Sequence, residues 1–226
     1  MCDSTDIAKA PPPSELMPGG TGLRLVLASR SPRRRQLLNE AGFAHDAIDP
    51  GVDDGTMRPG TSSPRHWVAS LACMKARAGF ERLPASDRPL TAVLGADTVV
   101  VKKSEIIGQP KGAEDAQRIV ERLQDGEHEV LTGVCLMVEG PAGEPIRRLL
   151  LTDSARVRVG RLGPERIEPY IQSGQWRGKA GAYNLSERMA DGWPITFDGD
   201  PGTIMGLPMR SLAPRLRSVL RGALHA

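Results

Sequence analysis

Cysteine is scarce in this sequence, and the few cysteines it has are widely spaced. The 226 residues contain three of them, Cys2, Cys73 and Cys135, and no two form a C-x-x-C pair. Structural zinc sites and disulfide frameworks both need several thiols at short or regular spacings. The cysteine pattern therefore argues against a zinc protein and against a disulfide-stapled secreted domain.

Long apolar runs are also absent. No segment near the N-terminus has the apolar core of a signal peptide, and no run approaches the roughly 20 residues that cross a bilayer. We therefore expect a cytoplasmic protein that does not bind a membrane. Residues 1–21 are rich in proline and glycine and show no periodicity, which predicts a mobile N-terminal leader before a single domain at residues 22–226.

Aromatic residues and net charge are low as well. Aromatic residues make up 4% of the chain and the net charge is only +3, so stacking platforms and a long basic track are both missing. We therefore do not expect nucleic acid as a partner. The 39% of hydrophobic and 25% of charged residues are typical of a globular domain, in which a local basic cleft can still bind a small anion.

The clearest local signal is the stretch LASRSPRRRQLL at residues 27–38. An apolar run at residues 23–28 predicts a strand, and Ser31 followed by Pro32 predicts the start of a helix. Arginines at residues 33–35 then fill the first helical turn, where each cation is disfavoured by about 0.3–1 kcal/mol. A phosphate site would explain them, because helix N-termini and arginines both bind anions. The alternative is that the arginines are simply solvated, and the glycine pattern of a P-loop is absent.

The remaining chain predicts alternating strands and helices followed by a hairpin. Helical periodicity is found at residues 63–80, 113–124 and 164–173, and in a closing helix that carries Leu212, Leu216 and Leu220. Apolar and β-branched runs predict strands at residues 90–103, 128–138 and 146–159. Residues 199–208 are expected to form a turn and a short buried segment. This order indicates an α/β (mixed α+β) domain, and the hairpin requires a mixed sheet.

Asp97 is the most informative single residue. It lies within the apolar run AVLGADTVVV, where an ionised carboxylate is costly unless it is paired, hydrogen-bonded or bound to a metal. One interpretation is that Asp97 holds a divalent cation and accepts a proton from water. The other is that Gly95 marks a β-bulge and Asp97 merely caps a loop.

Other charged residues have an ordinary and a functional interpretation. Lys75 lies in the apolar stripe of the helix predicted at residues 63–80, where a lone lysine usually extends to the surface but could also pair with a buried aspartate. Asp53 and Asp54 lie in a turn and could simply be solvated, and Lys179 follows Gly178 in a small-residue loop. All four would suit a site for a metal ion and a chain of phosphates.

Six short blocks occur in order along the chain: LASRSPRRRQLL, MKARA, GADTVV, TGV, KAGAY and GLPM. Together they resemble the Maf family of septum-formation-inhibitor-like nucleoside triphosphate pyrophosphatases. The resemblance implies an elongated mixed sheet flanked by helices, similar to the inosine triphosphatase fold. It also implies metal-dependent hydrolysis between the α and β phosphates of non-canonical, modified or pyrimidine nucleotides. Family members are often dimeric, so a homodimer is a further expectation.

The resemblance also implies roles for individual residues. Asp97 matches the family's proton acceptor, and either Asp53 or Asp54 is the nearest match to an acidic residue that would share Mg²⁺ or Mn²⁺ with it. The predicted phosphate-binding residues are Ser29, Arg33, Arg34, Lys75 and Lys179. The residues that match the family's positions for base choice are Arg33, Thr98 and Ser186.

Two stretches depart from the family pattern. IIGQP places Gln109 where relatives commonly have a lysine, and Lys111 is a candidate for the missing charge. YNLSERM replaces the Y-G-I-Q-G of many relatives, whose glutamine helps to recognise the base, so a preference for thymidine or uridine triphosphate stays open. These departures motivate an alternative hypothesis, in which the protein is a nucleotide-binding regulator of septation with little catalysis.

Overall fold

The computed structural model describes residues 22–53, 55, 57–140 and 146–221, so the predicted leader lies outside the described residues. Within them, seven strands form one sheet in the order β2-β1-β3-β5-β6-β7, and β4 pairs with β3 off this path. The strands are β1 (Arg24–Ala28), β2 (Asp46–Ile48), β3 (Thr91–Lys102), β4 (Glu105–Ile107), β5 (Gly126–Val138), β6 (Arg147–Val159) and β7 (Ile195–Asp198). The helices are α1 (Pro32–Glu40), α2 (Pro64–Glu81), α3 (Ala113–Leu123), α4 (Pro164–Ser173), α5 (Leu185–Ala190), α6 (Pro201–Met205) and α7 (Met209–Leu220).

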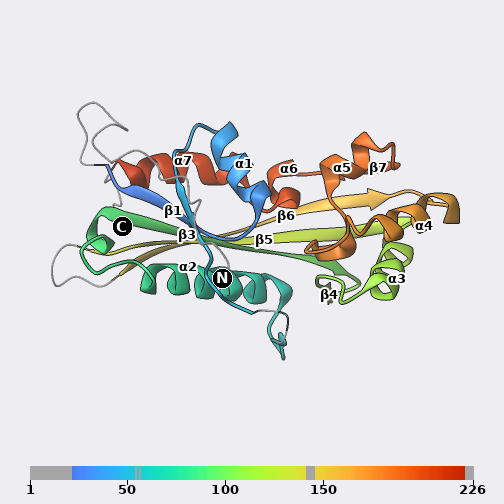
Figure 1. The fold of residues 1–226 in the computed structure, drawn as a ribbon, viewed down its shortest axis with the longest axis horizontal. Helices are drawn as coiled ribbons and strands as arrows, with labels where there is room; N and C mark the ends of the chain where they lie inside the picture. The colour runs from blue at the N-terminus through green and yellow to red at the C-terminus, as the bar shows by residue number, and fades with distance from the viewer. Residues whose placement is uncertain (1–21, 54, 56, 141–145, 222–226) are drawn as a thin grey trace, which may run out of the picture.

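The sheet is mixed and long, as predicted. β2, β1 and β3 are parallel, whereas β3, β5, β6 and β7 pair in antiparallel fashion. Figure 1 shows α2 along one face of the sheet, α1, α6 and α7 on the opposite side, and α3 and α4 at one end. This arrangement confirms the mixed α/β architecture. Among the described residues, no helix is long and apolar enough to span a membrane.

The main predicted elements are present, and the elements that the sequence did not reveal are short. β2 and β4 have three residues each, β7 has four and α5 has six. Segments of this length are too brief to show a helical or strand period. The expected turn and buried segment at residues 199–208 contain the five-residue helix α6.

Helix α2 approaches the sheet more closely than ordinary side chains would allow. A Cβ atom at Gly95 would lie 2.4 Å from both the carbonyl oxygen of Ala72 and the backbone nitrogen of Ala76. A Cβ atom at Gly133 of β5 would lie 2.5 Å from the carbonyl oxygen of Val68. These two glycines therefore bring the α2 backbone into direct contact with β3 and β5.

Gly95 does not form the β-bulge that its sequence position suggested. It lies opposite Cys135 in the β3–β5 ladder, whose register runs through it without interruption, and opposite Ala28 in the last pair of the β1–β3 ladder. The bulge interpretation is therefore wrong. The glycine is required by the close helix, and the strand continues straight to Asp97.

A buried polar pair joins β5 to the loop before α5. His128, which is 3% exposed, shares a 2.8 Å hydrogen bond between its Nε2 and the Tyr183 hydroxyl. Burial lowers the pKa of His128 to about 4, and the positive charge of Lys102 contributes to the shift. The imidazole is therefore neutral in the folded protein near pH 7.

We expect Gly95→Ala to lower the free energy of unfolding by about 1–3 kcal/mol, because the added methyl group must push α2 away from the sheet. Urea unfolding of the variant measures this change. Gly108→Ala is the control, since a Cβ atom there meets no heavy atom within 4 Å. Equal unfolding midpoints for the two variants would contradict the close packing described above.

His128 should also make stability depend on pH. Between its ordinary pKa of 6.5 and its folded value of about 4, the unfolded chain binds a proton that the folded chain excludes. The free energy of unfolding should therefore fall by up to about 3 kcal/mol as the pH drops through this window, with no further loss below it. Urea titrations of the parent and of His128→Gln test this, because the difference between them should shrink as the pH falls. A difference that stays constant with pH would contradict a neutral, buried histidine.

Candidate active site

A cleft of about 710 Å³ opens at the carboxyl end of β1, beside an edge of β3. β1 ends opposite Gly95, and β4 begins to pair only at Val100, so β3 has no strand on this side over residues 96–99 within the described chain. Ligands of α/β proteins commonly bind beyond the carboxyl ends of strands. The short β1 therefore leaves space for a ligand next to Asp97 and Thr98, which both line the cleft.

Asp97 and Lys75 form a buried ion pair on the α2 side of the sheet. The Nζ atom of Lys75 lies 2.5 Å from Oδ1 of Asp97, and the two side chains are 13% and 8% exposed. Lys75 comes from α2, the helix held against the sheet at Gly95. The structure thus brings Lys75 to a buried aspartate, which is the condition under which the sequence suggested a counter-ion.

Arg34 ties several segments together on the opposite side of the sheet. Its Nη1 donates to Oγ of Ser29 at 3.1 Å, its Nη2 to Oγ1 of Thr98 at 3.1 Å, and its Nε to the carbonyl oxygen of Gly206 at 3.0 Å. Arg34 is 9% exposed and lines the cleft. Its guanidinium therefore joins α1 to the end of β1, to β3 and to the turn between α6 and α7. Arg35, by contrast, is exposed.

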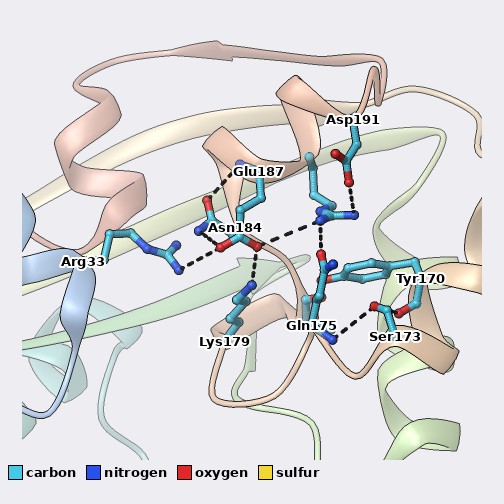
Figure 2. A network of polar contacts seen from close by, with 10 residues as sticks. Arg33, Tyr170, Ser173, Gln175, Lys179, Asn184, Glu187 and Asp191 are labelled. Atoms are coloured by element: carbon cyan, nitrogen blue, oxygen red, sulfur yellow. Dashed lines mark hydrogen bonds and ion pairs between the residues drawn. The ribbon is translucent and has the colours of Figure 1, made fainter.

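A second group of charges lies where α5 borders the cleft (Figure 2). Lys179 donates a hydrogen bond to Oε2 of Glu187, Asn184 donates one to Oε1 at 2.7 Å, and Nη2 of Arg33 lies 3.9 Å from Oε1. All four residues line the cleft. Burial opposes ionisation of Glu187, but the hydrogen bond from Lys179 and the charges of Lys179, Arg33 and Arg188 outweigh it and lower its pKa. Burial lowers the pKa of Arg33, and Glu187 partly offsets this.

Residues 24–219 match the family model described as "Maf-like protein". The chain belongs to the Maf-like family. A protein named dTTP/UTP pyrophosphatase from Anaeromyxobacter sp. (strain Fw109-5) is 38% identical to it, over 86% of this chain and 88% of the relative. A protein of the same name from Salinibacter ruber (strain DSM 13855 / M31) is 36% identical, over 89% of this chain and 94% of the relative.

The cleft of this Maf-like protein contains Glu187 in place of the predicted Ser186. Ser186 is exposed, its Oγ lies 3.1 Å from Sδ of Met205, and it is not among the residues that line the cleft. Glu187 was missed by the sequence analysis, although a signal for it was present. Asn184-x-x-Glu187 has the spacing of a capping box, and the Asn184 side chain does accept a hydrogen bond from the Glu187 backbone nitrogen.

The acidic loop after β2 places in the cleft a residue that was not predicted. Asp53 is exposed, accepts a hydrogen bond from the backbone of Gly55 at 3.1 Å and does not line the cleft. Asp54 lies outside the described residues. Asp49, which follows β2 directly, does line the cleft. Its position at the carboxyl end of a strand would have identified it, had the three-residue strand been recognisable from the sequence.

The departure at residue 109 also lies in the cleft. Gln109 lines it, whereas Lys111 is exposed, lies outside the lining and donates a backbone hydrogen bond to Asp115. The structure therefore does not bring Lys111 to the place of the lysine found in relatives. This cleft carries a neutral amide at that point.

Two carboxylates could hold a divalent cation here. Asp97 and Asp49 both line the cleft, and the described residues contain no group of three or more His, Cys, Asp or Glu side chains suited to a metal. Mg²⁺ is often held by one or two carboxylates together with water and the phosphates of a substrate. The donor set thus fits a metal that binds with a nucleotide.

Replacing Arg34 tests its role as a tie between segments. Arg34→Lys keeps the charge but cannot donate to Ser29, Thr98 and Gly206 at once, so we expect the free energy of unfolding to fall by about 1.5–3 kcal/mol. Urea unfolding measures this, with Arg35→Lys as the exposed neighbouring control. A stability of Arg34→Lys equal to that of the control would show that the three hydrogen bonds contribute little.

Proposed function

We propose that this Maf-like protein hydrolyses nucleoside triphosphates between the α and β phosphates, giving a nucleoside monophosphate and pyrophosphate. The observation that carries the proposal is that the arginine turn and Asp97 line the same cleft although they approach it from opposite sides of the sheet. A cleft that combines several cations with a buried carboxylate suits a polyanion attacked by water. The names of the relatives support dTTP and UTP as the substrates to test first.

The phosphates would bind between the α1 and α5 sides of the cleft. Arg33 at the start of α1 and Lys179 before α5 are the cations that we assign to them, with Ser29 and the N-terminus of α1 as hydrogen-bond donors. Arg34 would act mainly by holding Ser29 and Thr98 in place, because its guanidinium is already bonded to both. This assignment separates two arginines that are adjacent in the sequence.

The chemical step uses Asp97 as the proton acceptor. A water molecule attacks the α-phosphorus, its proton passes to the Asp97 carboxylate, and the bond between the α-phosphorus and the bridging oxygen breaks, so that pyrophosphate leaves. Lys75 keeps the carboxylate in position beside the open edge of β3. A divalent cation held by Asp97 and Asp49 would supply charge neutralisation of the phosphate oxygens.

Base recognition is assigned to the neighbourhood of Thr98. Thr98 accepts a hydrogen bond from Arg34 and shares one with Thr132 at 2.9 Å. We therefore propose that Thr98 shapes the base site by positioning Arg34. Asp53 and Asp54 stay predictions as metal ligands, as does Ser186 for base choice. The homodimer and the cytoplasmic location also stay predictions.

Gln109 is the observation that favours the alternative hypothesis. It places a neutral amide in the cleft where relatives commonly have a lysine. Lys111 does not restore the positive charge there, because it is exposed and lies outside the lining of the cleft. A weaker hold on the phosphates would fit a nucleotide-binding regulator with little turnover. The two hypotheses differ in whether pyrophosphate is released.

Incubation of the purified protein with Mg²⁺ and a panel of nucleotides tests the activity. The panel contains dTTP, UTP, dCTP, GTP and 7-methylguanosine triphosphate, and the readout is pyrophosphate together with the monophosphate. We expect turnover that a chelator abolishes, and a loss of at least about 100-fold in kcat for Asp97→Asn, because the proton acceptor is removed.

Glu121→Gln on the exposed face of α3 is the control for the loss of one negative charge. A parental rate for Asp97→Asn would overturn the role of Asp97. Nucleotide binding by the parent without pyrophosphate from any member of the panel would favour the regulator.

A further inference from the structure

We propose that Glu187 is an internal anion that occupies a phosphate-binding position between Lys179 and Arg33, and that the phosphates of the ligand displace it. This inference rests on the proposed function, in which the same two cations bind the triphosphate. Glu187 would then set the affinity of the cleft for phosphate without taking part in the chemical step. Its neighbour Ser186, which matches a specificity position of the family, does not line the cleft.

The contacts of Glu187 are those that a bound phosphate would make. One carboxylate oxygen accepts a hydrogen bond from Lys179, and the other accepts one from Asn184 and lies 3.9 Å from Arg33 (Figure 2). Carboxylate and phosphate oxygens are both charged acceptors and compete for the same ammonium and guanidinium donors. A phosphate that approaches Lys179 must therefore replace Glu187 or tolerate its negative charge.

The side chain of Glu187 can leave without disturbing the core. It is 41% exposed, whereas the Lys179 and Arg33 side chains are 15% and 24% exposed. The carboxylate therefore has solvent beside it, and the two cations remain in the cleft wall when it turns away. A half-exposed glutamate contributes little to packing.

Arg188 lies beside the Glu187 carboxylate and is held by further contacts of its own. Its guanidinium lies 3.9 Å from Oε2 of Glu187 and 2.8 Å from Oδ2 of Asp191, and it is stacked 4.3 Å from the ring centre of Tyr170. The Arg188 side chain is only 5% exposed. Because this residue is held by its own contacts, Glu187 can exchange partners while the helix that carries it stays in place.

A purely structural role for Glu187 predicts the opposite result on mutation. If Glu187 only holds Lys179 and Arg33 in the right positions, its removal should weaken phosphate binding. If it competes with phosphate, its removal should strengthen binding. The sign of the change in affinity therefore distinguishes the two roles.

Calorimetric titration with inorganic pyrophosphate and Mg²⁺ measures that sign. For Glu187→Gln, which keeps an acceptor for Asn184, we expect pyrophosphate to bind about tenfold more tightly, or about 1.4 kcal/mol. The KM for the triphosphate should fall as well. Glu81→Gln is the matched control, since Glu81 pairs with Arg77 on the exposed surface of α2. This variant should bind pyrophosphate with the affinity of the parent.

A double-mutant cycle identifies the cation involved. In a Lys179→Met background, Glu187→Gln should give a clearly smaller gain, because the main donor for which the two anions compete is gone. Glu187→Ala is a second variant that lacks the negative charge. Thermal unfolding verifies that each variant is folded.

Unchanged or weaker pyrophosphate binding in both folded Glu187 variants would overturn the proposal, and so would an equal gain with and without Lys179. A parent that does not bind pyrophosphate would overturn it too. The titration needs no turnover, so a parent that binds pyrophosphate but hydrolyses no nucleotide would contradict the proposed function alone.

Discussion

The contact between Lys75 and Asp97 depends on how closely α2 lies against the sheet. Gly95 and Gly133 remove the side chains that would otherwise separate the helix backbone from β3 and β5. Lys75 then reaches a carboxylate that is almost fully buried. An unpaired charge at this depth would be strongly destabilising, so the helix position, the lysine and the aspartate form one unit. The close approach of α2 and the pairing with Lys75 therefore hold the Asp97 carboxylate at the edge of the cleft.

Charge balance explains how so many cations can gather in one cleft before a ligand arrives. Asp97 neutralises Lys75, while Glu187 neutralises Lys179 and lies near Arg33. Ser29, Thr98 and Gly206 accept hydrogen bonds from Arg34. The positive charges in the cleft are thus stabilised by a buried ion pair, a half-exposed ion pair and a set of oxygen dipoles. Of the two ion pairs, the one at Glu187 is the more accessible to solvent.

The long elements and much of the site could be predicted from the sequence because they leave local signals. The Ser31-Pro32 start of α1, the apolar stripe of α2 and the carboxylate within β3 each carried such a signal. Asp49 left no such signal, because it belongs to a loop after a three-residue strand, and the signal for Glu187 was only a capping-box spacing at the start of a six-residue helix. Their place in the cleft is set by contacts between distant parts of the chain. The same holds for Arg34, whose acceptor at Gly206 is 172 residues away.

The end of β1 at Ala28 has a consequence for the behaviour of the protein in concentrated solution. Within the described residues, no strand pairs with this edge of β3 over residues 96–99, and unpaired sheet edges can pair with strands of other molecules. Here the unpaired part of the edge is only four residues long, and Arg33, Arg34 and Lys75 line the cleft beside it. An apolar strand from another chain would have to desolvate these charges to pair with it. Charged side chains at this unpaired edge thus disfavour edge-to-edge pairing with another chain.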